Sequence, residues 1–225
     1  MKQVQSLLNR YFGNPPSDGS PDWQKIAAAI TLLKRLCIIS GAPGTGKTTT
    51  VAKFLGVLIE WTQDPPLRIH LCAPTGKAAA RLGASLSDAS LSMDCPPAVA
   101  AALGKLDTST IHRLLRPQPG GRSFFFNARN PLPTDVVVVD EASMVDLVLM
   151  DRLVQAAPKE ARLVILGDKD QLASVEAGAV FGDLCQDAQK RRYSPGMRHL
   201  LGTLAQVTLP AVKENMSLLI LAIGA

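Results

Sequence analysis

The segment Gly41–Thr48 holds residues whose types and spacing suit phosphate binding. It reads G-A-P-G-T-G-K-T and matches the pattern G-x-x-x-x-G-K-[ST] at every fixed position. Its glycines allow backbone angles that direct several N–H groups at one anion. We expect Lys47 to reach the β- and γ-phosphates of a nucleoside triphosphate, and the Thr48 hydroxyl to hold Mg²⁺. The alternative is a chance glycine turn before a helix. The expected nucleotide-binding residues of the loop are Gly41, Ala42, Pro43, Gly44, Thr45, Gly46, Lys47, Thr48 and Thr49.

A second group of candidate catalytic residues follows four consecutive valines at positions 136–139. Asp140 and Glu141 come directly after this run. Burying two carboxylates at the end of a strand is costly unless they have a partner, and Mg²⁺ and water are suitable partners. We expect Asp140 to hold Mg²⁺ through water and Glu141 to orient and polarise the attacking water. The alternative is a helix cap that contains two acids.

Short apolar runs at 36–40, 67–73, 135–139 and 162–167 are expected to be the strands that position these groups. The valine run suits a strand buried on both faces of a parallel sheet. After Lys47, apolar residues recur at the spacing of one helix face. Ligands bind at the carboxyl ends of parallel strands. Gln171 follows the last of these runs and could sense the γ-phosphate there. The pattern predicts an α/β fold with a mostly parallel sheet sandwiched by helices.

Several other residues allow two interpretations. Gln24 lies on a helix ahead of the loop and could present its amide to adenine, or it could be a solvated surface residue. Thr75 and Lys77 follow a strand and suit a phosphodiester backbone, or they are a helix cap and an exposed lysine. Thr110 and His112 could contact phosphates, although a lone histidine is more often structural. These alternatives stay open on the residues alone.

The stretch Phe124–Phe126, between Arg122 and Arg129, also has two interpretations. Aromatic residues between arginines can form a base-stacking platform. A short hairpin strand that packs one side on the core is the simpler account, and we favour it.

Composition indicates a globular protein without a membrane segment. The chain has 225 residues, 47% hydrophobic and 19% charged, and a net charge of +5, enough for one α/β domain with extensions. The basic run at 190–192 is typical of a solvated surface. The four cysteines are far apart, which favours buried free thiols over a zinc site or disulfides.

We expect a cytoplasmic location, because no signal peptide opens the chain and the apolar residues 217–225 are too few to span a bilayer.

We expect three parts along the chain. Residues 1–19 are a linker or the end of a preceding domain, residues 20–186 are the ATPase, and residues 187–225 are a poorly defined extension. Residues 217–223 could form a strand or a buried helical turn.

Six ordered stretches resemble a superfamily 1 helicase and, within that group, the RecD family of exodeoxyribonuclease V alpha subunits. They are D-W-Q-K at 22–25, I-S-G-A-P-G-T-G-K-T-T-T at 39–50, A-P-T-G-K-A-A-A-R-L at 73–82, T-I-H-R-L-L at 110–115, V-V-D-E-A-S-M at 138–144 and G-D-K-D-Q-L-A-S-V-E-A-G at 167–178. A phosphate loop alone indicates only a nucleotide, whereas this ordered set is specific. The resemblance implies a P-loop NTPase with a RecA-like fold, the first motor lobe of a helicase, using ATP and Mg²⁺.

The resemblance also implies roles for matching residues. Gln24 matches an adenine-reading glutamine. The ATPase positions are matched by Lys47, Thr48, Asp140, Glu141 and Gln171, and the segments that contact single-stranded DNA by Thr75, Lys77, Thr110 and His112. The family translocates 5′ to 3′ with RecB-like and RecC-like subunits in double-strand break repair. Its nuclease centre lies in the RecB-like subunit, so we expect no nuclease residues here.

The sequence departs from the family in one respect. A helicase of this class closes two RecA-like lobes on ATP, and the second lobe supplies arginines. We find no motif of a second lobe, and Arg191, Arg192 and Arg198 lie in a region without a matching motif. We therefore expect only the first lobe in this chain. The alternatives are a module that binds nucleotide with little turnover and another P-loop class, for which we find neither an L-S-G-G-Q nor an N-K-x-D signature.

Overall fold

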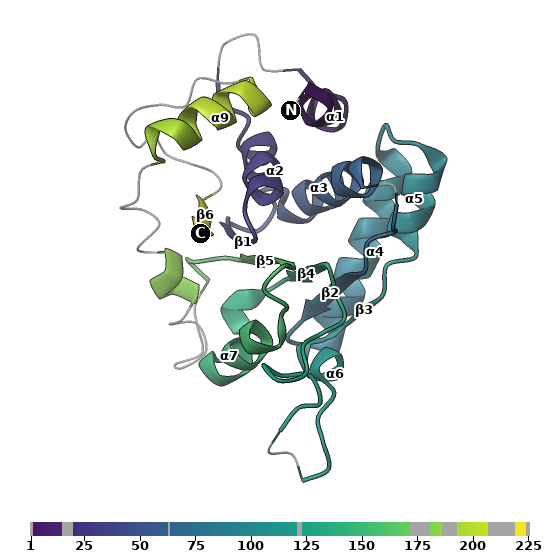
Figure 1. Cartoon of the computed structure of the whole chain (residues 1–225), viewed down its shortest axis with the longest axis vertical. Helices are drawn as coiled ribbons and strands as arrows, with labels where there is room; N and C mark the ends of the chain where they lie inside the picture. The colour runs from purple at the N-terminus through teal and green to yellow at the C-terminus, as the bar shows by residue number, and fades with distance from the viewer. Residues whose placement is uncertain are drawn as a thin grey trace.

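A computed structural model describes residues 2–14, 20–62, 64–120, 123–171, 181–185 and 193–206, and the backbone of 219–223. In these residues a single sheet is covered by helices on both faces (Figure 1). The basic run at 190–192, with Arg191 and Arg192, lies outside the described residues. The predicted α/β class is confirmed.

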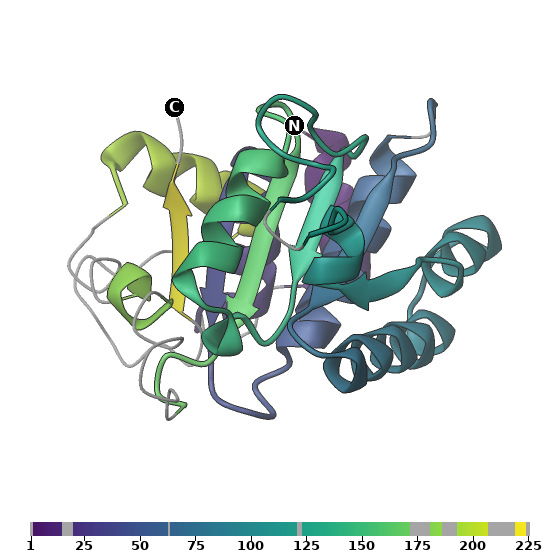
Figure 2. The ribbon, with the colours of Figure 1, turned by 90° about the horizontal axis from the view of Figure 1, so that it is seen from below.

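The described strands form one mostly parallel sheet. In chain order they are β1 (Leu36–Ser40), β2 (Ile69–Ala73), β3 (Thr108–Thr110), β4 (Val136–Val139), β5 (Arg162–Gly167) and β6 (Leu219–Ile223). Their order across the sheet is β3-β2-β4-β5-β1-β6, and β1 to β5 pair in parallel. β6 pairs antiparallel with β1, and its arrow points the opposite way in Figure 2. Of the two interpretations for residues 217–223, the strand is therefore correct over 219–223.

The helices divide between the two faces. Buried residues of one face come from α1 (Lys2–Phe12), α2 (Trp23–Leu33), α3 (Lys47–Trp61), α4 (Gly76–Ser92), α5 (Pro97–Gly104) and α9 (Pro195–Ala205). The other face is covered by α6 (Ile111–Leu115), the short 3₁₀ helix η1 (Ala142–Met144), α7 (Leu147–Ala156) and residues 181–185.

The valine run of β4 is buried on both sides, as its composition predicts. Val136 and Val138 pack in the cluster under α2 and α3, whereas Val137 and Val139 pack in the cluster under α7. Successive side chains of a strand point to opposite faces of the sheet, so only a strand with apolar residues at every position can lie in the middle of this sandwich.

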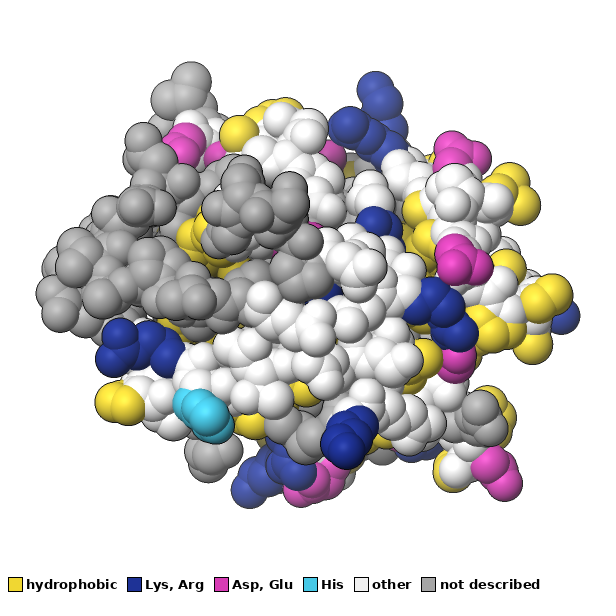
Figure 3. Space-filling view, turned by 90° about the horizontal axis from the view of Figure 1, so that it is seen from above, with side chains coloured by type: hydrophobic (Ala, Val, Ile, Leu, Met, Phe, Trp, Pro, Cys, Tyr) yellow, Lys and Arg dark blue, Asp and Glu magenta, His cyan; other side chains and the backbone are white. Residues whose placement is uncertain are grey.

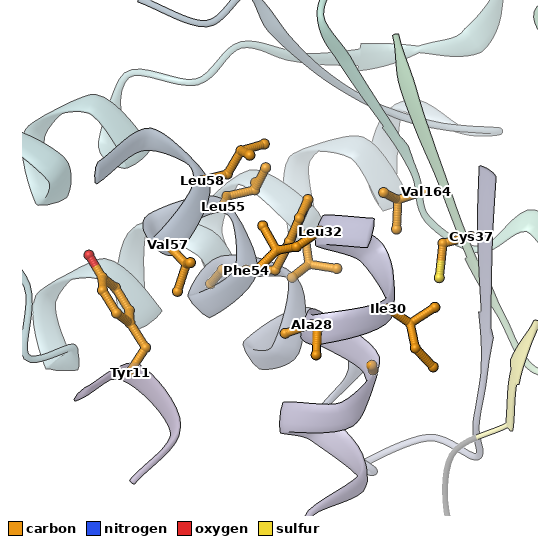
Figure 4. Packing of buried hydrophobic residues seen from close by; sticks show 14 of the residues in the cluster. Tyr11, Ala28, Ile30, Leu32, Cys37, Phe54, Leu55, Val57, Leu58 and Val164 are labelled. Atoms are coloured by element: carbon orange, nitrogen blue, oxygen red, sulfur yellow. The ribbon is translucent and has the colours of Figure 1, made fainter. Parts of the chain in front are cut away.

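The larger core lies where α2 and α3 pack on each other and on the sheet. Figure 4 shows Ala28, Ile30 and Leu32 of α2 beside Phe54 and Leu55 of α3, with Cys37 and Val164 from the strands. Each of the residues drawn is buried. This packing holds the beginning of α3, and with it the phosphate loop, against the carboxyl ends of β1 and β5.

The helices α1 and α9 pack on this same core. Tyr11 of α1 and Leu201 of α9 belong to the cluster that contains Phe54. Lys25 of α2 is fully buried, and its Nζ donates to Asn9 Oδ1 at 2.6 Å and to the Gly13 carbonyl at 2.9 Å. The division of the chain at residues 19 and 186 stays a prediction.

The cysteines are free thiols, as their spacing indicates. Cys37, Cys72 and Cys185 are buried and Cys95 is half-buried. Burial raises the pKa of the Cys37 and Cys72 thiols to about 12, so both are inert at neutral pH.

The surface carries both signs of charge. Figure 3 shows the face opposite to that of Figure 2, where Lys and Arg side chains are interspersed with Asp and Glu and do not form one continuous basic patch. Among the described helices, we find none with the length and apolar character that a membrane crossing requires.

Candidate nucleotide and nucleic-acid site

The predicted site residues gather at one edge of the sheet because β1 to β5 run in the same direction. The loop after β1 is the phosphate loop, which Figure 2 shows below the sheet with the other loops of this edge. Asp140 and Glu141 follow β4, Gln171 follows β5, Thr75 and Lys77 follow β2, and Thr110 ends β3. The strand order therefore places the nucleotide candidates on β1, β5 and β4, and the nucleic-acid candidates on the neighbouring β2 and β3.

The phosphate loop is tied down at its start and turns sharply at its end. The N–H of Gly41 donates to the Gly167 carbonyl of β5 at 3.1 Å. Gly44 and Gly46 have φ angles of 81° and 78°, in the left-handed region that glycine adopts without a Cβ penalty. The hydroxyl of Thr45 donates to the Ala42 carbonyl at 2.8 Å. Gly46 is the N-cap of α3, so the positive end of that helix dipole lies at the loop.

Lys47 and Asp140 line the same cavity, and burial disfavours the charged form of each. Burial lowers the pKa of the Lys47 ammonium, although the charges of Asp168 and Asp140 oppose this effect. Burial raises the pKa of the Asp140 carboxyl against the N–H of Glu141 and the charges of Lys47 and Arg81. The Lys47 Nζ donates to the Gly41 carbonyl and, at 3.1 Å, to the Ala42 carbonyl. An anion beside Lys47 and a cation beside Asp140 would favour the charged form of each group, so these residues fit a phosphate with Mg²⁺.

The Glu141 side chain lines the cavity at the same edge of the sheet and is 33% exposed. Its backbone has a φ of 52°, an uncommon angle for a residue with a side chain. Its N–H donates to Asp140 Oδ1 at 2.8 Å, which orients the two acids relative to each other. Its Oε1 lies 3.9 Å from Arg81 Nη1 on α4.

Gln171 is oriented by a serine that the sequence did not single out. The buried Ser143 hydroxyl of η1 donates to Gln171 Oε1 at 3.0 Å. This contact fixes the amide oxygen, and as far as the described residues show, the N–H groups of the Gln171 amide can donate to an acceptor such as a phosphate oxygen. The only signal for Ser143 was its place three residues after Asp140 in the stretch V-V-D-E-A-S-M.

Replacing Ser143 with alanine should slow ATP hydrolysis about two- to tenfold with little effect on nucleotide affinity. One hydrogen bond is worth about 0.5–1.5 kcal/mol, and about 1.4 kcal/mol corresponds to a factor of ten in rate. Single-turnover hydrolysis measures the effect. Ser123→Ala is the matched control, because Ser123 also donates to a glutamine, Gln118, but in an exposed loop. Equal rates for Ser143→Ala and the native chain would contradict the assignment of Gln171.

Gln24 lies over the end of the phosphate loop. Its Nε2 donates to the Thr45 carbonyl at 3.2 Å. A Cβ built on Gly46 would come within 2.3 Å of the same nitrogen. The amide still has one N–H and its oxygen for a base. Gln24 is half-buried, and its role as an adenine-reading residue stays a prediction.

A cavity of about 410 Å³, within the usual range for ligand sites, is lined by Lys47, Thr48, Asp140, Glu141 and Gln171 together with part of the phosphate loop, but not by Gln24. Four further polar or charged side chains on its wall had no predicted role: Arg81, Ser85, Ser143 and Asp168. Among the described residues, no three His, Cys, Asp or Glu side chains form a metal-binding group. The predicted metal ligands Thr48 and Asp140 suit Mg²⁺, which commonly takes one or two protein carboxylates together with substrate phosphates and water.

For Thr75 and Lys77 the simpler interpretation, a helix cap and an exposed lysine, describes the structure, and DNA contact stays a prediction. Thr75 caps α4, because its Oγ1 accepts from the Ala78 N–H at 3.2 Å, and Lys77 is exposed. Thr110 caps α6 by accepting from the Arg113 N–H at 3.1 Å. A capping hydroxyl accepts through its oxygen and keeps its own O–H as a donor. Each threonine can therefore cap its helix and still donate to a phosphate.

His112 and the phenylalanine stretch form a separate patch. The exposed His112 lies with its ring centroid 5.9 Å from that of Phe124. Phe124 and Phe126 pack against the core cluster under α7, and Phe124 bridges Pro117 in antiparallel fashion. Only Phe125 is exposed, at 46%. The favoured packing of one side on the core is confirmed for Phe124 and Phe126, although the segment forms isolated bridges rather than a strand. Arg122 lies outside the described residues.

Comparison with known proteins supports the resemblance. The model of an AAA domain (AAA_19) matches residues 24–177. The chain is 45% identical over 196 residues to the RecBCD enzyme subunit RecD of Mycobacterium tuberculosis (strain H37Rv), which covers 82% of this chain and 34% of that protein. It is 46% identical over 187 residues to the subunit of the same name from Haemophilus influenzae, with 82% and 29% covered.

A third relative has a different name. The chain is 35% identical over 202 residues to the ATP-dependent RecD2 DNA helicase of Deinococcus radiodurans, covering 83% of this chain and 25% of that protein. The chain thus spans about a third or less of the length of these curated relatives. With the AAA_19 domain over most of its length and RecD subunits among its relatives, this chain belongs to the AAA_19 family and, within it, to the RecD group.

Proposed function

We propose that this chain is the ATP-binding first motor lobe of a DNA helicase. The observation that carries the proposal is that Lys47 and Asp140, both partly buried, line one cavity with Glu141 and Gln171. In this arrangement a cation-binding carboxylate, a phosphate-binding lysine and a candidate base face one space.

Each residue then has a distinct task. Lys47 and the loop N–H groups hold the phosphates, while Thr48 and Asp140 hold Mg²⁺, which when bound neutralises charge on the phosphates. Glu141 orients a water and accepts its proton. Gln171, fixed by Ser143, donates toward the terminal phosphate, and Gln24 reads the adenine with the amide groups that Thr45 leaves available.

We assign the β2 and β3 side of the edge to single-stranded DNA. Thr75 and Thr110 keep a hydroxyl donor, and Lys77 and His112 are exposed beside them. These are groups that contact phosphodiesters without reading bases. The site of hydrolysis and the strand of DNA would lie side by side, as coupling of the two requires.

For the whole protein we propose the activity that the family resemblance implies. A second RecA-like lobe closes over the cavity and supplies arginines to the transition state. The motor moves 5′ to 3′ with RecB-like and RecC-like partners in double-strand break repair in the cytoplasm. Without that lobe we expect the purified 225-residue chain to bind ATP·Mg²⁺ weakly and to hydrolyse it very slowly. DNA-stimulated ATP hydrolysis by the 225-residue chain at the rate of a complete helicase would contradict the proposal that a second lobe is needed for fast turnover.

The DNA part of the proposal is tested by the salt dependence of oligonucleotide binding. Replacing Lys77 with alanine should weaken binding of a fluorescent single-stranded oligonucleotide and reduce the slope of log K against log salt by about 0.7, the contribution of one phosphate contact on a single strand. Lys105→Ala, which removes an exposed lysine at the end of α5, should leave the slope unchanged. Identical slopes for both variants would remove Lys77 from the DNA site.

A further inference from the structure

Arg81 is a cationic residue of α4 with no role assigned so far. It lies between the proposed nucleotide site and the proposed DNA site. It lies on α4 four residues after Lys77, and residues four apart share one face of a helix. It also lines the cavity that Lys47, Asp140 and Glu141 line. Helix α4 therefore carries a cation toward the proposed DNA strand at its first turn and a second cation toward the nucleotide one turn later.

The contact between Arg81 and Glu141 is loose. The two charged groups are 3.9 Å apart, and the Arg81 side chain is 81% exposed whereas that of Glu141 is 33% exposed. Exposed pairs of this kind contribute little to stability, so the pair can exchange partners at low cost. Among the residues that the structure describes, Arg81 forms the ion pair with the Glu141 carboxylate.

The pair has a consequence for the task assigned to Glu141. At 3.9 Å the pair is an ionic contact rather than a hydrogen bond, and the nearby positive charge attracts the Glu141 carboxylate toward Arg81 and away from a water in the cavity. A DNA phosphate near Lys77 would offer Arg81 a competing anion on its own helix face. One arginine cannot satisfy both anions through the same donors.

We propose that Arg81 is a positioning residue that couples DNA binding to the nucleotide site: it pairs with Glu141 when no DNA is bound and turns to a DNA phosphate when DNA lies on the first turn of α4. Glu141 is then released to orient water. This inference rests on the proposed function, because it needs both the DNA strand at Lys77 and the role of Glu141.

A double-mutant cycle on DNA affinity tests this coupling without relying on turnover. Single-stranded oligonucleotide binding is measured for the native chain, Glu141→Gln, Arg81→Met and the double variant, all without nucleotide. Glu141→Gln should tighten DNA binding about two- to fivefold, because the competing partner of Arg81 is lost. In the Arg81→Met background the same change should have little effect, since no arginine remains to be released.

The cycle separates coupling from simple charge repulsion. If Glu141→Gln tightens binding equally in both backgrounds, the effect is removal of a negative charge near DNA, and the inference is wrong. It is also wrong if Arg81→Met binds DNA as tightly as Arg152→Met, a control that removes an exposed arginine of α7. Arg81→Lys should retain part of the coupling, because it keeps the charge on this face of α4.

Failure of the proposed function has a different signature. If the native chain and Lys77→Ala bind the oligonucleotide equally, the DNA site itself is misplaced and the inference fails with it. If Lys77→Ala weakens binding but the cycle is additive, the DNA site stands and only the role of Arg81 is rejected. Because the Arg81 side chain is largely exposed, its replacement should leave the melting temperature unchanged.

Discussion

Replacing Lys47 with alanine should weaken ATP·Mg²⁺ binding by about 100-fold or more and leave the fold intact. The substitution removes a charge-assisted hydrogen bond to phosphate. Removing one partner of a buried charge pair costs about 2–5 kcal/mol of binding free energy, and about 1.4 kcal/mol corresponds to a factor of ten in affinity. The fold should survive because Lys47 donates only to the Gly41 and Ala42 carbonyls of the loop, and Ala42 is exposed to water.

Equilibrium binding of a fluorescent ATP analogue measures this effect, and thermal unfolding checks the fold. Lys105→Ala removes the same charge from an exposed position outside the cavity and should bind nucleotide like the native chain. A Lys47→Ala variant that is folded and binds with native affinity would mean that the nucleotide site lies elsewhere.

Replacing Glu141 with glutamine should retain ATP·Mg²⁺ binding and slow hydrolysis by about 10²- to 10⁴-fold, the usual contribution of a positioned general base. The amide has nearly the shape of the carboxylate but cannot take the proton from water. Binding should persist because the phosphate loop, Lys47 and Asp140 are unchanged. Bound ATP should therefore remain intact over the time in which the native chain converts it.

Single-turnover hydrolysis with the protein in excess over labelled ATP is the appropriate measurement, since it detects slow conversion. Glu160→Gln is a suitable control, because Glu160 pairs with Arg35 on the surface and its side chain is 79% exposed. Native hydrolysis rates in Glu141→Gln would transfer the role of base to another group. A loss of ATP binding in the same variant would instead assign Glu141 to holding the nucleotide.

Much of the fold was predictable because it depends on local pattern. The valines at 136–139 require apolar surroundings on both sides, and the structure places them in the middle of the sheet. The glycines of the phosphate loop require a turn with positive φ, and Gly44 and Gly46 adopt it. The apolar spacing after Lys47 predicts α3, whose residues Val51, Phe54, Leu55 and Leu58 are buried.

Other features depend on which strands lie side by side, and local pattern carries no information about that order. Ser143 meets Gln171 only because β4 and β5 are neighbours. Arg81 meets Glu141 only because α4 follows β2, the other neighbour of β4. Residues 219–223 form a strand because they pair with the outer edge of β1, a contact that the local sequence does not indicate.

The sequence by itself determined that this chain has a phosphate loop, a carboxylate pair after a buried strand and the ordered stretches of the RecD group. These features are set by residue types at short spacing, where turn geometry and burial act directly. The tertiary structure alone decided that Ser143 orients Gln171 and that Arg81 lies near Glu141. Contacts between residues far apart in the chain arise from the parallel strand order, which brings five loop ends to one edge.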